Sequence, residues 1–197
     1  MIGSPGEGLL RLLVVFDRLE IPYMIGGSGA SSVHGLVRTT ADVDIVANLG
    51  EDVPSLVAEL QGEFYIDEQQ VRAALEHGRS FNVIHYRSSY KFDIFPLTGD
   101  RYQQMQFGRR RYETSSAFTG KPLELAVSSP EDVILSKLRW YRQGGKVSEQ
   151  QWNDVLGVIA AQRDRLDLPY LGEWGQYLGV VDLLEQALAE GRKPHSP

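Results

Sequence analysis

Apolar residues recur along this chain with two periodicities, one typical of a strand and one typical of a helix. Short apolar runs such as Tyr23-Met24-Ile25 stop at glycines, whereas residues 8–20 place apolar side chains between charged ones at helical spacing. The ranges expected to be helical are 8–20, 28–36, 52–61, 68–77, 128–144, 148–165, a helix that opens at Pro169, and 180–189. The ranges expected to be strands are 22–25, 42–47, 81–86, 90–95, 111–114 and 123–127.

This order of elements predicts an α/β (α+β) protein with a mixed sheet flanked by helices. Helices and strands alternate in residues 1–127, which we expect to form the core, and only helices follow in residues 128–197, which we expect to form a C-terminal helical part. The change falls at Ser128-Ser129-Pro130-Glu131-Asp132. Serine at the cap, proline at the first position and acids in the first turn are typical of a helix N-terminus.

The first chemical feature is the turn Gly26-Gly27-Ser28, which ends the first predicted strand. Glycines let the backbone adopt positive φ and approach a ligand closely, and the N–H groups at the start of a helix favour an anion such as a phosphate. The turn is therefore a candidate phosphate site, in which Ser28 would donate its hydroxyl. The alternative is a tight turn with no ligand.

The second feature is the pair Asp42 and Asp44 on the next predicted strand. Residues two apart on a strand face the same side, about 6.6 Å apart along the chain, so both carboxylates project together. Like charges placed side by side repel unless a cation lies between them. Mg²⁺ prefers such oxygen ligands, and pairs of ions are typical of phosphoryl-transfer sites, so we expect two Mg²⁺ ions, for which Mn²⁺ could substitute. The alternative is an ordinary pair of acids beside a turn.

A third acid, Asp93, stands between Phe92 and Ile94 in the second strand of a predicted hairpin. An acid in an apolar strand must be paired, hydrogen-bonded or metal-bound. If this strand lies beside the Asp42 strand, three carboxylates share one edge, and Asp93 could bind metal or help deprotonate an attacking hydroxyl. The alternative is a salt bridge from Asp93 to Lys91 or Arg87.

The glycine turn, the Asp-x-Asp strand and the later acid resemble, in this order, the DNA polymerase beta-like nucleotidyltransferase superfamily. The stretch from Gly26 to Ile45 is similar, more narrowly, to the bacterial branch of abortive-infection and toxin–antitoxin nucleotidyltransferases, in which an Arg-x-Thr-x-Asp-x-Asp arrangement recurs. Arg38 and Thr40 complete that arrangement here. The branch also carries a lysine and a later acid in its helical part, for which Lys137 and Asp154 look like counterparts.

The resemblance implies a fold, a reaction and a set of site residues. The fold is the nucleotidyltransferase sheet with flanking helices, and the reaction moves a nucleoside monophosphate from an NTP to an acceptor hydroxyl. The implied catalytic residues are Asp42, Asp44, Asp93 and Lys137, of which the three aspartates also bind metal. The implied nucleotide-binding residues are Gly26, Gly27, Ser28, Arg38, Thr40 and Asp154. Three of these assignments have a structural alternative. Arg38 fits a surface arginine equally well, Lys137 could be a packed side chain, and Asp154 could cap a helix face.

Across the superfamily the acceptor varies from tRNA ends to antibiotics and proteins. The narrower resemblance favours a toxin-like enzyme that acts on tRNA or another cellular acceptor and has an antitoxin protein as partner. A small-molecule antibiotic nucleotidyltransferase is the alternative, and a nucleotide-binding partner protein without turnover is the rival from another class.

The composition of the chain limits the kinds of metal site, cellular location and partner that we expect. The chain has 197 residues, no cysteine and a net charge of −6, so a thiolate zinc site is excluded and a reducing, cytoplasmic location is expected. A net negative charge argues against a surface built for nonspecific nucleic-acid binding. The apolar N-terminal run is interrupted by Arg11 and Asp17, so we expect neither a membrane span nor a secretory signal. His34 and His85 are read as packed or hydrogen-bonded side chains.

Overall fold

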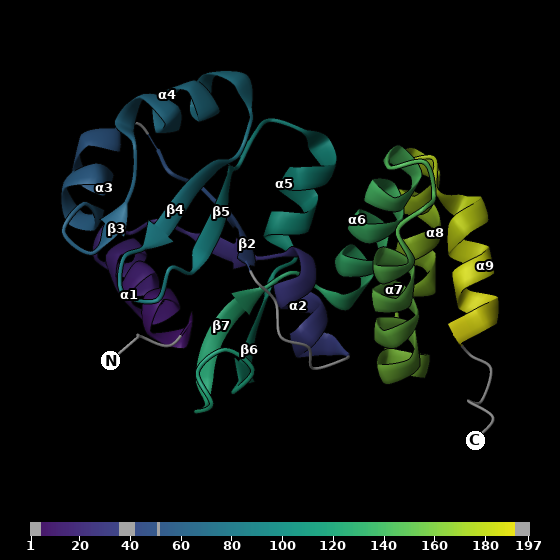
Figure 1. Ribbon diagram of the computed structural model, residues 1–197. Helices are drawn as coiled ribbons and strands as arrows, with labels where there is room; N and C mark the ends of the chain where they lie inside the picture. Colours follow the sequence, from purple (N-terminus) through teal and green to yellow (C-terminus); the bar gives the residue numbers. More distant parts are fainter. Residues whose placement is uncertain (1–4, 36–41, 51, 192–197) are drawn as a thin grey trace. The chain divides into compact units, whose positions relative to one another are not determined.

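The computed structural model describes residues 5–35, 42–50 and 52–191 (Figure 1). These residues fall into two compact units. The described part of the first unit is 5–26, 42–50 and 52–127, and that of the second is 27–35 and 128–191. The second unit thus contains a short segment from the N-terminal half in addition to the residues after 127.

A mixed sheet forms the centre of the first unit. Within the described residues seven strands follow one another in the order β3-β4-β5-β2-β1-β7-β6. Their bounds are β1 Tyr23–Ile25, β2 Asp42–Ala47, β3 Phe64–Tyr65, β4 Phe81–His85, β5 Lys91–Pro96, β6 Arg111–Ser115 and β7 Leu123–Val127. β2 pairs with β5 and β1 with β7 in parallel, and the remaining neighbours are antiparallel. The predicted fold class, a mixed sheet flanked by helices, is confirmed.

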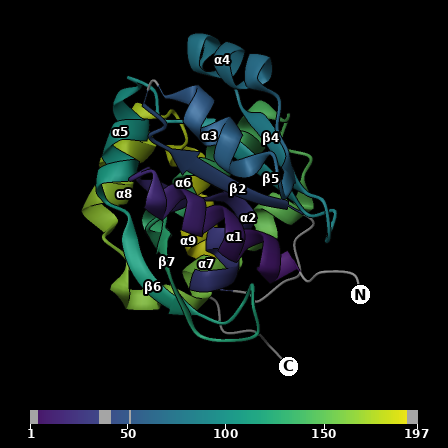
Figure 2. The same ribbon diagram turned by 90° about the vertical axis from the view of Figure 1, so that its left-hand side faces the viewer.

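Four helices of the described chain belong to the sheet unit: α1 Pro5–Arg18, α3 Val53–Leu60, α4 Glu68–His77 and α5 Arg101–Gly108. α1 packs on α3, α3 on α4, and α4 on β4 and β5, as the two views of the ribbon show (Figures 1 and 2). The central strands bury every second side chain beneath these helices; Val43 and Ile45 of β2 and Phe92 and Ile94 of β5 are fully buried. The alternate residues of β2 and β5 are only partly buried, and they form the face that carries the acids.

The second unit is helical. Its elements are α2 Gly27–His34, α6 Pro130–Gln143, α7 Glu149–Gln162, the 3₁₀ turn Arg163–Arg165, α8 Leu168–Tyr177 and α9 Val181–Gly191. α2 packs on both α6 and α7, α7 packs on α9, and α8 packs on α6 and α9. Ile134 and Leu138 of α6 and Val155 and Ile159 of α7 are buried between these helices. α2 therefore owes its packing to helices that lie about a hundred residues later in the sequence.

Most helices begin after a residue with a short polar side chain, which accepts a hydrogen bond from the backbone N–H group three residues further on. Such bonds, 2.8–3.3 Å long, are made by Asp52, Asp67, Asp100, Ser129, Ser148 and Asp167. Each of these bonds satisfies a helix N–H group that has no partner within the helix. These caps explain why sequence patterns located the helix starts within a few residues.

Two short elements were not predicted. β3 has only two residues, which is too short to show an alternating pattern, and it forms because Phe64 and Tyr65 pair with His85 and Ile84 of β4. α5 is rich in glutamine and lacks a clear apolar stripe. Its start is set by the Asp100 cap, and its buried side chains are Tyr102, Gln106 and Phe107. No helix in the described ranges is both long and apolar enough to cross a membrane.

Close backbone packing in the helical unit depends on Gly35, which directly follows α2. A Cβ atom at residue 35 would lie 3.0 Å from the carbonyl oxygen of Gly157 and 3.1 Å from the Cα of Val158, both in α7. Since these neighbours are backbone atoms of a helix, they cannot rotate away as a side-chain tip could. The absence of a side chain at Gly35 is what lets the end of α2 approach α7.

We expect Gly35→Ala to lower the free energy of unfolding by about 1–3 kcal/mol, because the added methyl group overpacks this contact. The matched control is Gly172→Ala in α8, where a Cβ would meet no atom within 4 Å. Alanine should stabilise that helix by about 0.5–1 kcal/mol. Urea unfolding of the three proteins measures both changes, and equal midpoints for Gly35→Ala and the wild type would show that α2 does not pack as described.

Candidate active site

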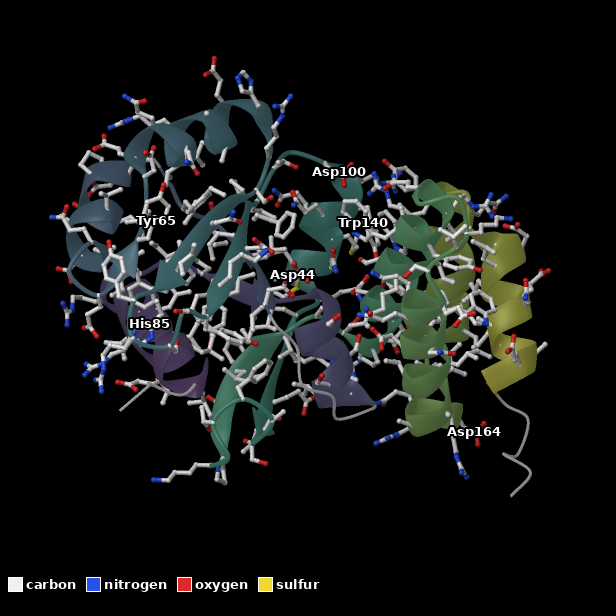
Figure 3. All side chains as sticks on the ribbon, viewed as in Figure 1. Asp44, Tyr65, His85, Asp100, Trp140 and Asp164 are labelled. Carbon is white, nitrogen blue, oxygen red and sulfur yellow. The ribbon has the colours of Figure 1, made fainter. Side chains whose placement is uncertain are left out.

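Three carboxylates lie on one face of the sheet, on two adjacent parallel strands. Asp44 of β2 is the register partner of Asp93 on β5, and Asp42 is the partner of Lys91 (Figure 3 labels Asp44). Residues paired in register and residues two apart on a strand share a face. Asp42, Asp44 and Asp93 are therefore brought together by the backbone itself, as expected if the two strands were neighbours.

A lysine joins two of these acids. The Lys91 Nζ lies 2.8 Å from Oδ2 of Asp93 and 3.4 Å from Oδ2 of Asp42. The hydrogen bond to Asp93 is the main reason why the pKa of Lys91 is raised above its usual value, although desolvation acts in the opposite direction. Lys91 therefore stays protonated at neutral pH. The alternative reading of Asp93 as a salt-bridge partner of Lys91 is confirmed, whereas Arg87 pairs with Glu7 instead.

Lys91 and Asn82 are two polar residues of this face that sequence reasoning did not include among the site residues. Asn82 of β4 is the register partner of Asp93 and is exposed. The signal for Lys91 was its spacing of two residues from Asp93, which places both on one side of a strand. Nothing in the sequence pointed to Asn82, since its place beside Asp93 depends on how the hairpin is registered.

The glycine turn begins beside Asp44. The Gly26 N–H donates to the carbonyl oxygen of Asp44 at 2.9 Å, and a side chain at residue 26 would meet only that oxygen, at 4.0 Å. The chain then enters α2 at Gly27, whose φ of 50° is in the left-handed region that glycine adopts readily. The predicted strand, turn and helix are thus all present. Whether the turn binds phosphate stays a prediction.

The chemistry of the donors suits a hard divalent cation, because three aspartates offer only oxygen ligands. In the described parts of the chain, however, no three His, Asp or Glu side chains gather closely enough to hold a metal ion. The side chains of Asp42 and Asp93 converge on the Lys91 ammonium instead. The backbone register aligns the three acids on one face, where the Lys91 ammonium bridges Asp42 and Asp93.

Within the helical unit Lys137 and Asp154 form a buried ion pair. The Lys137 Nζ donates to Oδ2 of Asp154 at 2.8 Å and to Oε1 of Gln151 at 3.1 Å. Only 4% of the Lys137 side chain and 8% of the Asp154 side chain are exposed. This pair holds α6 to α7, so the structural reading of both residues has a clear basis. Their catalytic and nucleotide-binding roles stay predictions.

The remaining predicted residues differ in how far the structure describes them. Arg38 and Thr40 lie outside the described residues. Ser28 is in the first turn of α2, where its carbonyl oxygen accepts the Ser32 hydroxyl at 3.0 Å. Both histidines are buried and hydrogen-bonded, His34 to the Ser128 carbonyl oxygen and His85 to the Ser88 hydroxyl, as expected of packed side chains.

Comparison with solved structures decides the fold. The antibiotic-resistance factor ANT(2'')-Ia in solution matches with a TM-score of 0.56 and 14% identity, over 96% of this chain and 97% of that chain. The same factor in complex with adenylyl-2''-tobramycin matches with a TM-score of 0.55 and 13% identity, over 88% and 96% of the two chains. The chain has the nucleotidyltransferase fold. A scan of protein-family models found no match, and neither did a search of the curated proteins.

Lys137→Met should cost about 3–5 kcal/mol of unfolding free energy, because Asp154 would be left as a buried charge without its partner. The double variant Lys137→Met/Asp154→Leu removes both charges and should recover most of that loss. Urea unfolding of the wild type, both single variants and the double variant measures the coupling. A single Lys137→Met variant as stable as the wild type would contradict a buried ion pair.

Proposed function

We propose that this protein is a divalent-cation-dependent nucleotidyltransferase, which moves a nucleoside monophosphate from an NTP to an acceptor hydroxyl and releases pyrophosphate. The observation that carries the proposal is the register of β2 and β5. It puts Asp42, Asp44 and Asp93 on one face of the sheet. Gly26, the first residue of the glycine turn, is bonded through its N–H to the carbonyl oxygen of Asp44. This arrangement occurs in a chain with the nucleotidyltransferase fold, matched over almost the full length of ANT(2'')-Ia.

In this proposal the three aspartates have two roles, cation binding and proton transfer. Asp42 and Asp44 would hold Mg²⁺, with Mn²⁺ as a substitute, and the bound cation would neutralise charge on the triphosphate and its leaving group. Asp93 would bind the cation and accept the proton of the acceptor hydroxyl. The N–H groups and the hydroxyl at Gly26, Gly27 and Ser28 would bind a phosphate. Arg38, Thr40, Lys137 and Asp154 are predicted to bind the nucleotide, and Lys137 also to act in catalysis.

A small cationic molecule is the acceptor that the charge of the chain favours. The net charge of −6 repels a polyanion such as tRNA and attracts a polycation. The titles of the matched structures associate ANT(2'')-Ia with antibiotic resistance and with an adenylylated tobramycin, which is consistent with such an acceptor. We therefore place a small-molecule acceptor before tRNA, reversing the order that the narrower sequence resemblance suggested.

The toxin-like reading remains the second candidate. It rests on the match of Arg38, Thr40, Asp42 and Asp44 to the toxin–antitoxin branch and implies an antitoxin protein as partner and a cytoplasmic site of action. Overexpression separates it from the first candidate: a toxic enzyme should arrest growth, and Asp44→Asn should relieve the arrest. A nucleotide-binding protein without turnover would bind NTP but transfer no label.

Asp44→Asn should reduce transfer of α-³²P label from NTP by at least about a thousandfold, because the cation would lose a charged ligand. Asp164→Asn is the matched control, since Asp164 is an exposed acid on the 3₁₀ turn of the helical unit (Figure 3). That control should transfer label at the wild-type rate. Near-full activity in Asp44→Asn would refute the assignment of the site.

The acceptor is identified by offering each of the four NTPs, labelled at the α-phosphate, together with cell RNA, cell protein or a set of aminoglycosides. We expect label on an aminoglycoside, formed by the wild type and not by Asp44→Asn. Label in tRNA alone would reverse the order of the two acceptor classes. Absence of label from every fraction, with NTP binding intact, would favour the non-catalytic reading.

A further inference from the structure

Strand β6, Arg111–Ser115, lies at one edge of the sheet (Figures 1 and 2). Among the described strands, β7 pairs with one side of β6 and none pairs with its other side. An edge strand can pair with a strand of another chain through its backbone N–H and C=O groups, and a very short edge does so poorly. The opposite edge, β3, has only two residues. β6 is therefore the edge at which this sheet is best able to extend.

β6 lacks the features that commonly keep an edge strand from pairing. Its five residues, Arg-Tyr-Glu-Thr-Ser, include neither proline nor lysine. They pair one for one with Leu123–Val127 of β7, so no bulge bends the strand. Tyrosine and threonine are enriched in strands, and Tyr112 and Thr114 are both exposed here. Both the geometry and the exposure of β6 suit pairing with a further strand.

The order of side chains makes β6 complementary to a second copy of itself. Two identical antiparallel strands in one sheet are related by a two-fold axis, so every pair formed on one side of the axis is repeated on the other. With Tyr112 on that axis, Arg111 of each strand lies opposite Glu113 of the other. Opposite charges placed across a strand pair attract, as do two aromatic rings. This register therefore forms two Arg–Glu pairs and one pair of Tyr112 side chains.

The other registers of β6 on its own copy lack this match. Residues opposite each other share a face of the sheet, so the axis must pass through a residue and not between two. An axis at Arg111 or at Glu113 would set like charges opposite each other, which is destabilising. An axis at Thr114 would set Glu113 opposite Ser115 and form no charge pair. Charge thus selects the register centred on Tyr112.

We propose that two copies of this chain join their sheets through antiparallel pairing of β6 with β6, centred on Tyr112. The inference concerns assembly and does not depend on the proposed function. The Arg111 guanidinium has five N–H donors, so it can bind a carboxylate of the second copy in addition to groups of its own chain. Because the paired segment is short, the dimer is weak and its amount depends on protein concentration.

Disulfide cross-linking of the full chain tests the register, because the chain has no cysteine and each variant carries a single one. Tyr112→Cys would lie opposite its own copy, with Cα atoms about 4.5–5.5 Å apart, a distance that a disulfide spans. Thr114→Cys is the matched control, since it lies on the same face but about 13 Å from its own copy along the strands. Under mild oxidation by diamide, Tyr112→Cys should form the covalent dimer at least about tenfold faster than Thr114→Cys.

Equal rates for these two variants would indicate random collisions and would overturn the proposal. Glu113→Cys completes the series, because it reports the register in which the two glutamates oppose each other. Its cross-linking should be slower than that of Tyr112→Cys. A faster rate for Glu113→Cys would show that charge does not select the register, which would also overturn the proposal.

Charge reversal tests the pairing of Arg111 with Glu113. Sedimentation velocity of the wild type at increasing concentrations should show a monomer–dimer equilibrium. Arg111→Glu and Glu113→Arg should each weaken association at least about tenfold, because like charges then lie opposite each other twice. The double variant Arg111→Glu/Glu113→Arg restores opposite charges and should recover association. Thermal unfolding checks that each variant is folded.

The matched control for the change in net charge is Lys121→Glu, in the exposed turn that joins β6 to β7. It alters the charge of the chain as Arg111→Glu does and should associate as the wild type does. A wild type that remains monomeric at its highest soluble concentration would refute self-association at β6. A double variant as weak as the two single variants would refute the pairing of residues 111 and 113.

Discussion

The parallel pairing of β2 with β5 is the constraint on which the chemistry of the sheet unit depends. It aligns Asp42 with Lys91 and Asp44 with Asp93, and it places Val43, Ile45, Phe92 and Ile94 on the opposite, buried face. A shift of one residue would turn every side chain of one strand to the other face. Carboxylates would then enter the core and apolar groups would face water. Core packing and the arrangement of charges therefore select the same register.

The two units handle buried or crowded charge in different ways. In the helical unit, Lys137 and Asp154 neutralise each other inside the packing of α6 against α7, with Gln151 taking a further hydrogen bond. In the sheet unit, Asp42 and Asp93 share the Lys91 ammonium on a partly exposed face. Solvent ions therefore reach the charges on the sheet face, whereas they are shut out from the buried pair.

Much of the fold could be predicted because its signals are local. In β2, acids alternate with apolar residues, and a polar turn joins the two strands of the hairpin, β4 and β5. Ser129 and Asp67 each cap a helix through a hydrogen bond to the N–H group only three residues further on. Pairings between distant segments left no such signal. The sequence did not show that β2 is parallel to β5 or that Asn82 lies beside Asp93, because strand order is set by the packing of the whole sheet. The carboxylates of the candidate site could be named in advance, but their shared lysine partner could only be offered as one of two alternatives.

Helix α2 has a consequence for how this chain can be divided. It lies in the sequence between two adjacent strands of the sheet, yet its packing partners α6 and α7 come from the C-terminal segment, and His34 is bonded to the Ser128 carbonyl oxygen. A fragment ending at residue 127 would keep every strand but would strip α2 of the helices that cover it. The packing of α2 on the C-terminal helices thus crosses the boundary at residue 127 that the order of elements suggested. A chimera that takes its C-terminal helices from another protein would therefore need a matching α2 as well, because these segments pack on each other.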